Sequence, residues 1–417
     1  MLVFDVLYFL LVLILFPFWI RTVLKVDYRR ILGRRLSPSV GPSVKKRIWL
    51  HAVSVGEVKS LKNLIFQLNR RFPGRIVLSV TTPTGFECAT REYKDIEVIN
   101  APVDLTFVVR RFIRAINPGL LVLNELEIWP NWILMMKKSR VPILLVNGRI
   151  SDAAFKQYRR FSFFFKRFFP LISDFILQAE CYRSKFVQLG APAEKVQVCG
   201  NIKADEAEKT SRSIPSRSEV LDHLNAEANG RKVITLASSH FSDEQVLIPV
   251  IKKFEKMFSF IIVPRHITRV HEIINKLIEE GISYKVWSAG KRVDLGREVL
   301  IFDRIGYLVN ILSVSDVVLM GGTFDPKIGG HNLYEPAILG KPVVGGPFYN
   351  NFPDIGEELV EKGVYRPVGD SRELEEMFER LNDFYPADIE HAAIEAVIKR
   401  KGSTECILNR IQDLVNP

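Results

Sequence analysis

Short apolar runs and amphipathic stretches alternate along most of this chain of 417 residues. Apolar runs bounded by turn-forming residues predict buried strands, and in the first half they fall at residues 47–53, 75–80, 96–99, 119–124, 142–147, 174–178 and 196–200. Stretches between them, such as Val58–Arg71 and Phe107–Ile116, have the spacing of helices with one apolar face. Strand and helix in alternation predict a parallel sheet with helices on both faces.

A polar segment, Asp205–Glu219, interrupts this alternation and is the best candidate for a linker. The pattern then resumes, with predicted strands at 232–237, 259–263, 283–287, 298–302, 316–320 and 342–345 and a predicted helix over 388–401. A chain of this length is too long for one ordinary domain. The sequence therefore predicts an α/β protein of two doubly wound, Rossmann-like domains, residues 25–205 and 206–417, that face each other across a cleft and bind ligands beyond the carboxyl ends of their strands.

The amino terminus carries a separate signal. Leu2–Ile20 is almost wholly apolar, interrupted by Asp5 and Pro17, and is long enough for a helix to cross a bilayer. Basic residues follow this run, whereas a secretory signal would place its positive charge before the run and a small-residue cleavage site after it. The sequence predicts a membrane anchor helix over residues 1–24, with the rest of the chain on the cytoplasmic side. A helix lying in the membrane interface is the alternative.

The composition of the chain excludes some kinds of site but does not select one class of binding partner. The chain has 58 Lys and Arg against 47 Asp and Glu, a net charge of +11, which suits nucleic acid, an anionic membrane or acidic substrates without choosing among them. The four cysteines, Cys88, Cys181, Cys199 and Cys406, show no paired spacing, which indicates a reducing compartment and neither a disulfide framework nor a zinc site. The histidines show no ligand spacing either, so no metal is expected.

The stretch Tyr158–Phe169 mixes aromatic and basic residues densely. As a helix it could insert phenylalanine side chains at the acyl boundary of a membrane while Arg and Lys contact lipid phosphates. The alternative is a helix with a core-facing side and a solvated basic side. Both interpretations stay open, and the predicted anchor favours membrane contact at Phe161–Phe169.

Two glycine pairs follow the apolar run Val314–Met320. Gly321-Gly322, with Thr323 next, and Gly329-Gly330 lead into His331, Asn332 and Glu335. Glycine lets the backbone approach a ligand closely, and the start of the following helix would offer free N–H groups to a phosphate. A tight turn explains a glycine pair alone, but the added polar residues favour a nucleotide site.

Glu57 is the first candidate for chemistry. His51–Glu57 is a predicted strand that runs into a turn of small residues, and a helix is predicted from Val58. At the helix start the dipole would favour the ionised carboxylate, which could accept a proton from an attacking hydroxyl. The alternative is a carboxylate that only caps the first turn.

Polar residues also follow the other predicted strands of the first half. Glu125 and Glu127 would point to opposite sides if their strand persists, so at most one should face the ligand. Because these residues lie at successive strand ends, we expect them to line one face of the first domain. The group is Ser54, Gly56, Thr81, Thr82, Thr84, Gly85, Asp104, Glu125, Arg149 and Lys203.

The second half supplies residues suited to an anion. Ser238, Ser239 and His240 follow its first predicted strand, and Arg265 and His266 follow the second. Serine hydroxyls at a helix start and neighbouring arginines suit a phosphate or a sugar carboxylate. A solvated surface charge is the alternative for each arginine.

Together these motifs resemble the Kdo transferases, enzymes that move 3-deoxy-D-manno-octulosonic acid (Kdo) from CMP-Kdo onto the lipid A precursor. The similarity covers nearly the whole chain after the predicted anchor. It is carried by His-Ala-x-Ser-x-Gly-Glu, Thr-Thr-Pro-Thr-Gly, Glu-x-Glu-x-Trp-Pro-Asn, Asn-Gly-Arg-Ile-Ser, Gly-Asn-Ile-Lys, Ala-Ser-Ser-His and Pro-Arg-His, by the glycine block, and by Gly-Pro with Asn-Phe, which begin at 51, 81, 125, 147, 200, 237, 264, 321, 346 and 351.

The resemblance implies the GT-B architecture and an inverting transfer without metal or cofactor, in which Glu57 is the catalytic base. CMP-Kdo would be held by the segments with Arg265 and His266 and by the glycine block from Gly322 to Glu335. The acceptor would be the lipid A precursor (lipid IVA), at the cytoplasmic side of the inner membrane, and no nucleic acid would be bound.

The chain departs from the family pattern in ligand-side loops. Gly306-Tyr307-Leu308 stands where many members have Gly-Glu-Leu, Tyr334 stands where Leu is usual, and Ile267-Thr268 replaces a common Pro-Glu. Two other functions stay as alternatives: another GT-B enzyme that uses a UDP-sugar, and a non-catalytic, membrane-tethered nucleotide-binding module. The motif of Glu57 together with Gly329-Gly330-His331-Asn332 argues against the first, and the presence of the Glu57 carboxylate argues against the second.

Overall fold

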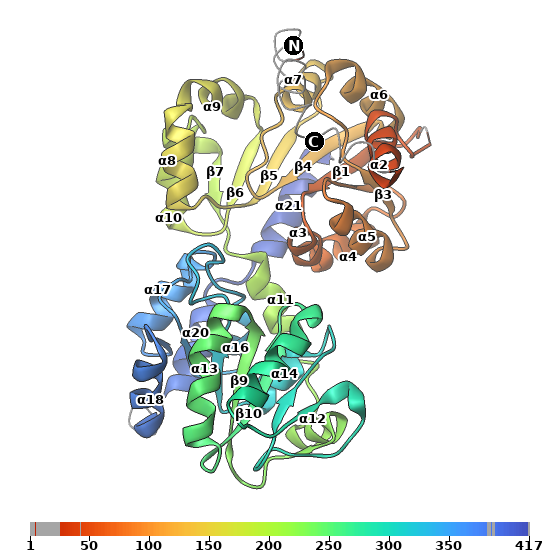
Figure 1. The fold of residues 1–417 in the computed structure, drawn as a ribbon. Helices are drawn as coiled ribbons and strands as arrows, with labels where there is room; N and C mark the ends of the chain where they lie inside the picture. The colour runs from red at the N-terminus through yellow and green to blue at the C-terminus, as the bar shows by residue number, and fades with distance from the viewer. Residues whose placement is uncertain (1–4, 6–25, 42, 382–384, 386–387, 416–417) are drawn as a thin grey trace. The chain divides into compact units, whose positions relative to one another are not determined.

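The computed structural model describes residues 5, 26–41, 43–381, 385 and 388–415, and it divides into two compact units (Figure 1). Unit 1 comprises residues 1–205 and 401–417, and unit 2 comprises residues 206–400. The predicted second domain extended to residue 417, whereas the last seventeen residues, 401–417, belong to unit 1.

The described residues of unit 1 form a seven-stranded sheet in the order β3-β2-β1-β4-β5-β6-β7, in which every pair of neighbours is parallel. The predicted apolar runs form these strands because the central strands are buried on both faces of the sheet, whereas the edge strands β3 and β7 each expose one residue. The strands are β1 (Arg47–Ala52), β2 (Ile76–Val80), β3 (Glu97–Asn100), β4 (Pro118–Asn124), β5 (Ile143–Gly148), β6 (Asp174–Leu177) and β7 (Val196–Val198).

Helices connect these strands, and each face of the sheet has its own apolar core. Alternate residues of a strand point to opposite faces, so Trp49 joins one cluster while Ile48 and Leu50 join the other. The helices of this part of the chain are α2 (Val26–Leu36), α3 (Val55–Ser60), α4 (Lys62–Arg71), α5 (Pro83–Glu92), α6 (Thr106–Ile116), α7 (Pro130–Lys138), α8 (Asp152–Arg160), α9 (Ser162–Phe168), α10 (Glu180–Gln188) and α11 (Ile202–Ser211).

The aromatic stretch is split between core and solvent. Phe165, Phe168 and Phe169 are buried in the core of unit 1, whereas Phe161 and Phe163 are 50% and 74% exposed. The stretch therefore has the core-facing side that one interpretation requires, and it also exposes two rings beside its basic residues.

Unit 2 repeats the architecture. Its described residues form a second parallel sheet of seven strands in the order β11-β13-β10-β9-β14-β15-β16, and a two-stranded sheet of β8 and β12 lies apart from it. The strands are β8 (Ala226–Glu227), β9 (Lys232–Ser239), β10 (Phe258–Pro264), β11 (Tyr284–Val286), β12 (Val293–Asp294), β13 (Val299–Ile301), β14 (Val317–Met320), β15 (Val343–Gly345) and β16 (Tyr365–Pro367). The helices are α12 (Arg217–Leu224), α13 (Phe241–Phe254), α14 (Val270–Glu279), α15 (Leu308–Val314), α16 (Tyr334–Ile338), α17 (Pro353–Glu361), α18 (Ser371–Glu379) and α20 (Ile389–Ile398).

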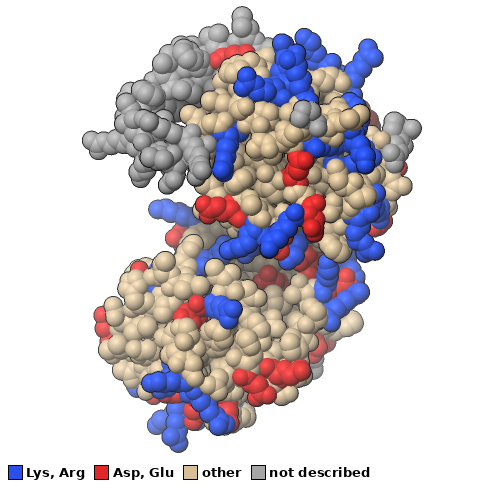
Figure 2. Space-filling model, turned by 90° about the vertical axis from the view of Figure 1, so that its right-hand side faces the viewer, with Lys and Arg blue, Asp and Glu red and all other residues tan. Residues whose placement is uncertain are grey.

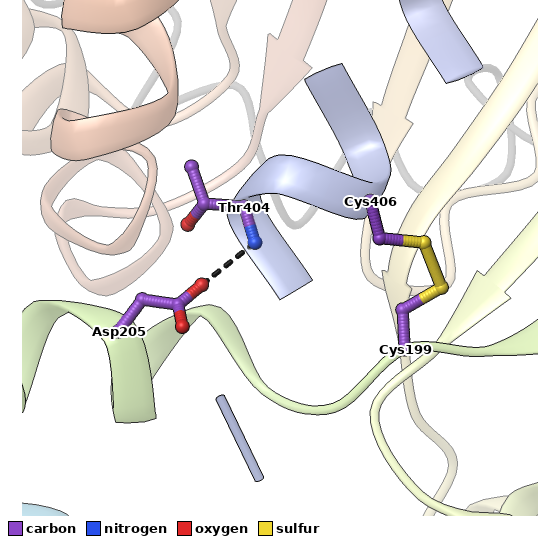
Figure 3. The surroundings of a disulfide bond; sticks show 4 residues. All are labelled: Cys199, Asp205, Thr404 and Cys406. Carbon is purple, nitrogen blue, oxygen red and sulfur yellow. Dashed lines mark hydrogen bonds between the residues drawn. A yellow bond between two sulfur atoms is a disulfide. The ribbon is translucent and has the colours of Figure 1, made fainter. Parts of the chain in front are cut away.

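The carboxy-terminal helix α21 (Ser403–Val415) completes unit 1. Its residues Ile407, Leu408 and Ile411 are fully buried in one of the two cores of that unit. The carboxylate of Asp205 accepts hydrogen bonds from the backbone N–H groups of Gly402 (2.8 Å) and Thr404 (2.6 Å), so it caps the start of this helix (Figure 3).

Cys199 and Cys406 form a disulfide beside this cap (Figure 3). The expectation that the scattered cysteines do not pair is wrong for these two, because the return of α21 to unit 1 brings together residues separated by 207 positions. Cys88 is a buried free thiol and Cys181 is an exposed one.

Two other predictions concern the linker and the membrane anchor. The predicted linker 205–219 is largely helical, since α11 and α12 cover most of it, and a Ser216–Glu219 capping box starts α12. The predicted anchor, residues 1–24, lies outside the described residues except for Asp5. Among the residues that are described, no helix is both long and apolar enough to span a membrane.

Candidate active site

The candidate residues lie where each sheet reverses its strand order. In unit 1 the chain moves outward from β1 to β2 and β3 and then returns to pair β4 with β1, and in unit 2 it pairs β14 with β9 in the same way. In open α/β sheets the loops beyond the carboxyl ends of two such strands part in opposite directions and leave room for a ligand. Each unit thus has a binding position set by its topology.

In unit 1 that position holds Glu57. The chain leaves β1 at Ala52, and Ser54 caps α3 by accepting a hydrogen bond from the Glu57 N–H (3.4 Å). The Glu57 carboxylate accepts hydrogen bonds from the Val53 N–H and the Asn124 side-chain amide, each at 3.1 Å, and from the Ser54 hydroxyl at 3.3 Å. The carboxylate therefore does contribute to local capping, and it is also held at the end of β4 by Asn124.

Three carboxyl groups interact electrostatically here. Burial raises the pKa of Glu57 above its ordinary value, and the Glu125 carboxylate raises it further, although the three hydrogen bonds act in the opposite direction. Burial, followed by repulsion from Glu57, raises the pKa of Glu127 to about 7. Glu125 itself pairs with Arg149, whose Nε lies 3.0 Å from the carboxylate. A raised pKa suits a group that must accept a proton near neutral pH.

Strand β4, which directly precedes Glu125, ends abruptly at Asn124. Glu125 has φ of +59°, in the left-handed region that non-glycine residues seldom adopt. Because of this conformation the strict alternation that placed Glu125 and Glu127 on opposite sides does not apply. The charge of Glu125 acts on Glu57, and the charge of Glu57 acts on Glu127. Backbone strain of this kind is typical of functional sites.

The strand ends beside Glu57 are fixed by buried hydrogen bonds. His51 is fully buried with its Nδ1 at 2.9 Å from the Ser79 hydroxyl, and burial lowers its pKa to about 3, so it is neutral. The Thr82 hydroxyl donates to the Val53 carbonyl (2.9 Å) and accepts from the Gly85 N–H (3.2 Å). A Cβ at Gly85 would lie 2.9 Å from a Val80 methyl group and 3.2 Å from the Ser54 carbonyl carbon, so this turn requires glycine.

Other residues predicted for unit 1 have different surroundings. Asp104 is buried and caps α7, since it accepts hydrogen bonds from the backbone N–H groups of Asn131 (3.2 Å) and Trp132 (3.1 Å). Burial raises its pKa to about 6. Gly56 and Thr84 are exposed, and Thr81 and Lys203 are partly exposed.

In unit 2 the same topological position holds a group of histidines. The Nε2 atoms of His240, after β9, and His331, in the glycine loop, lie 2.8 Å apart, and the two rings stack at 5.0 Å. His266 lies edge-on to His240 at 5.7 Å. Burial, together with the neighbouring Arg265 and histidines, lowers the pKa of His240 to about 4 and that of His331 to about 3. His240 and His331 are therefore neutral at pH 7.

Asp243 positions the glycine loop against β9. Its carboxylate accepts hydrogen bonds from the backbone N–H groups of His240 and Gly322, both at 2.7 Å. A Cβ at Gly321 would lie 2.3 Å from the Ser238 carbonyl oxygen, and Gly322 has φ of +74°, so neither position accommodates a larger residue without displacement. Ser238 itself has φ of +57°.

The remaining predicted donor residues divide between structure and exposure. The Ser239 hydroxyl donates to Glu244 (2.8 Å), which also pairs with Arg269 (2.9 Å). Thr323 is buried and binds the backbone of Met320 and Gly346, while Asn332 accepts from the Tyr334 N–H at 3.2 Å. Arg265 and His266 are exposed, and Asn332 and Glu335 are partly exposed, so these four residues are accessible to a ligand. Gly329 and Gly330 both have positive φ, 73° and 81°.

Two departures from the family pattern are packing residues. Tyr334 is fully buried, and its hydroxyl donates to Asp354. Tyr307 stacks on His223 at 4.1 Å. Asn124 and Asp243 were missed as site residues, although a polar residue that ends an apolar strand is a usable signal for Asn124.

Comparison with known proteins identifies the family of this chain. The family model of the 3-deoxy-D-manno-octulosonic-acid transferases (kdotransferase) matches residues 28–206. The 3-deoxy-D-manno-octulosonic acid transferase of Chlamydophila psittaci is 33% identical over 349 residues, which cover 81% of this chain and 78% of that protein. The enzyme of the same name from Haemophilus influenzae is 28% identical over 379 residues, 89% of this chain and 86% of that protein.

Solved structures show the same fold at low identity. UDP-GlcNAc 2-epimerase from Neisseria meningitidis aligns with a TM-score of 0.60 and 16% identity over 88% of this chain and 100% of that one. A glycosyltransferase from Rickettsia africae aligns with a TM-score of 0.60 and 14% identity over 90% of this chain and 100% of that one. The two parallel-sheet α/β units thus have the GT-B type of architecture. The sequence relatives show the family: the chain is a glycosyltransferase that belongs to the 3-deoxy-D-manno-octulosonic acid transferase family.

Proposed function

We propose that this protein transfers Kdo from CMP-Kdo to the lipid A precursor (lipid IVA), with inversion at the anomeric carbon and without a metal or cofactor. The observation that carries the proposal is the position of Glu57, a half-buried carboxylate at the reversal point of unit 1, in a chain 33% identical to a Kdo transferase. The alternative UDP-sugar enzyme has only fold-level support, because the epimerase structure is 16% identical.

In the proposed reaction an acceptor hydroxyl oxygen attacks the anomeric carbon of the donor from the face opposite the CMP. The new C–O bond forms as the bond from the anomeric carbon to the phosphate oxygen breaks, and CMP leaves with the electron pair. The hydroxyl proton passes to Glu57, whose raised pKa favours holding that proton and whose three hydrogen bonds fix the position of the carboxylate. The transition state resembles an oxocarbenium ion, as in glycoside cleavage.

We assign the phosphate of CMP-Kdo to unit 2. Arg265 offers a guanidinium fork, and the stacked group of His240, His266 and His331 offers ring N–H groups that can donate hydrogen bonds to phosphate oxygens. The backbone of the glycine loop is fixed by Asp243, so these groups would need little rearrangement to stabilise the departing phosphate.

We also propose that the protein acts at the cytoplasmic face of the inner membrane, held there by the predicted anchor at residues 1–24. The exposed Phe161 and Phe163, beside the basic residues of α8 and α9, are candidates for a further membrane contact. A glycolipid acceptor makes such an attachment useful, because the substrate stays in the bilayer.

The test is the variant Glu57→Gln, which keeps the shape of the side chain and removes the base. We expect transfer to fall by about 100- to 10,000-fold, the usual contribution of a general base, while CMP-Kdo binding measured by calorimetry stays unchanged. Glu87→Gln, an exposed acid on α5, is the matched control. Transfer within a few-fold of wild type in Glu57→Gln would exclude this role. Competition of CMP against UDP for the donor site separates the proposal from the UDP-sugar alternative.

A further inference from the structure

Helix α6 has two faces of opposite character. Val108, Val109, Phe112 and Ile116 are fully buried in the core of unit 1. The opposite stripe consists of Phe107, Arg110, Arg111 and Arg114, spaced so that all four lie along one side of a helix. We call this stripe the α6 arginine face. All four side chains are exposed, Phe107 by 62%, and the helix contains no acidic residue.

The α6 arginine face lines an open groove. With Pro38 and Ala115 its four residues enclose about 460 Å³. Some other arginines of unit 1 have a carboxylate partner, as Arg47 has in Glu97 at 3.0 Å. Within the described part of the chain the three arginines of this face form no ion pair, and Arg111 only reaches the Leu36 carbonyl at 3.5 Å. Three uncompensated guanidinium groups in one groove attract anions.

The position of the groove relative to the predicted anchor indicates what the anion is. Asp5 is part of the apolar run predicted as the anchor, and its carboxylate accepts hydrogen bonds from the Thr106 N–H (2.9 Å) and the Asn131 side-chain amide (3.1 Å). Thr106 is the first residue of α6. Phe107 lines the groove and follows Thr106 directly, so the groove begins beside a contact with the anchor segment, as expected if that segment lies in the membrane interface. Figure 2 looks onto this side of the molecule, and Lys and Arg side chains gather toward its upper end.

We propose that the α6 arginine face binds the phosphate groups of anionic phospholipids in the bilayer, in addition to the predicted anchor. Arginine is suited to this role because its planar fork bonds two phosphate oxygens at once. Phe107, at the start of the stripe and nearest Asp5, can enter the acyl boundary while the arginines stay at the headgroups. The inference rests on the membrane attachment in the proposed function, but on neither the donor nor the transfer reaction.

The experiment uses the full chain and vesicles of two compositions, phosphatidylcholine alone and phosphatidylcholine with phosphatidylglycerol. The anchor contributes to binding in both, so the ratio of the two partition coefficients isolates the contribution of charge. Each basic residue near an anionic surface contributes about a factor of five. We expect Arg110→Gln/Arg111→Gln/Arg114→Gln to reduce the ratio by about 100-fold, with binding to phosphatidylcholine unchanged.

A matched control removes three exposed basic residues from unit 2, as Lys256→Gln/Lys291→Gln/Arg372→Gln. It should leave the ratio near that of wild type. A triple α6 variant with the wild-type ratio, or a control that loses as much, would overturn the proposal. Transfer to a detergent-solubilised acceptor, measured separately, should be equal in both variants, so a failure of the proposed reaction would not be confused with a failure of this inference.

Discussion

Replacing Glu127 with glutamine should make the protein more stable at alkaline pH and change how its stability depends on pH. Glu127 follows β4 and has a pKa of about 7, against 4.5 for an ordinary glutamate, because burial and the charges of Glu57 and Glu125 disfavour its ionised form. The folded state therefore holds a proton that the unfolded state releases between pH 4.5 and 7. Its contribution to stability is full below pH 4.5 and is lost as the pH rises through about 7.

The magnitude follows from that difference in pKa. From 4.5 to about 7 is 2.5 units, which at about 1.4 kcal/mol per unit corresponds to about 3 kcal/mol. Solvent still reaches part of this carboxyl and screens the repulsion, so we expect about 2 kcal/mol. Between pH 5 and pH 8, the free energy of unfolding should therefore fall by about 2 kcal/mol less in Glu127→Gln than in wild type.

Urea unfolding followed by tryptophan fluorescence measures this difference. Trp129 and Trp132 lie near the site, with ring centroids 6.0 Å apart. Three of the four described tryptophans lie in unit 1, so the signal reports mainly on that unit. Glu87→Gln is the control for loss of an exposed acid. The reasoning is refuted if Glu127→Gln and wild type show the same change between pH 5 and pH 8. Since Glu127 lies close enough to Glu57 for their charges to repel, the acid limb of the rate profile should also move to lower pH in this variant.

Three other changes test separate parts of the structure. Cys406→Ser should lower stability by as much as about 5 kcal/mol, the chain-entropy value for the 207-residue separation of its disulfide, and dithiothreitol should lower the unfolding temperature of wild type but not of this variant. Phe168→Ala, in the core, should lower the free energy of urea unfolding by about 3–5 kcal/mol. Phe163 is 74% exposed, so Phe163→Ala should change the same quantity by less than about 0.5 kcal/mol. Equal losses would contradict the division of the aromatic stretch between core and solvent. CMP-Kdo binding should take up protons at pH 5, because an anion raises the pKa of His240 and His331 from about 4 and 3, and calorimetry in buffers of different ionisation enthalpy should show a smaller uptake in His331→Asn.

The sheets could be predicted from the sequence because their strands are buried on both faces and form continuous apolar runs. Shorter or polar strands gave no such signal: β8 and β12 have two residues each, and β16 is Tyr365–Pro367. The single helix predicted over Val58–Arg71 is divided at Leu61 into α3 and α4. An amphipathic pattern continues across such a break, so periodicity alone does not reveal it.

The candidate site was predictable to a similar degree. Residues at strand ends could be located because the carboxyl ends of parallel strands lie at one edge of their sheet. Glu57 lies at this edge in unit 1, and His331 lies at the corresponding edge in unit 2. The role of each side chain depends on long-range contacts, which spacing does not contain. Asp104 looked like a ligand residue and instead caps α7 through Asn131 and Trp132. Asp243 was not among the predicted site residues, although it fixes the glycine loop.

The return of the chain to unit 1 at residue 401 has a consequence for biosynthesis. Unit 2 is in effect an insertion within unit 1, and α21 supplies core residues such as Leu408. On the ribosome, unit 1 cannot complete its core until all of unit 2 has been made, although domains usually fold in the order of synthesis. The Asp205 cap forms only at that last step. An isolated unit 1 would therefore have to be expressed with residues 401–417 rejoined to it, and a nascent chain that stalls within unit 2 would leave an apolar surface available to chaperones.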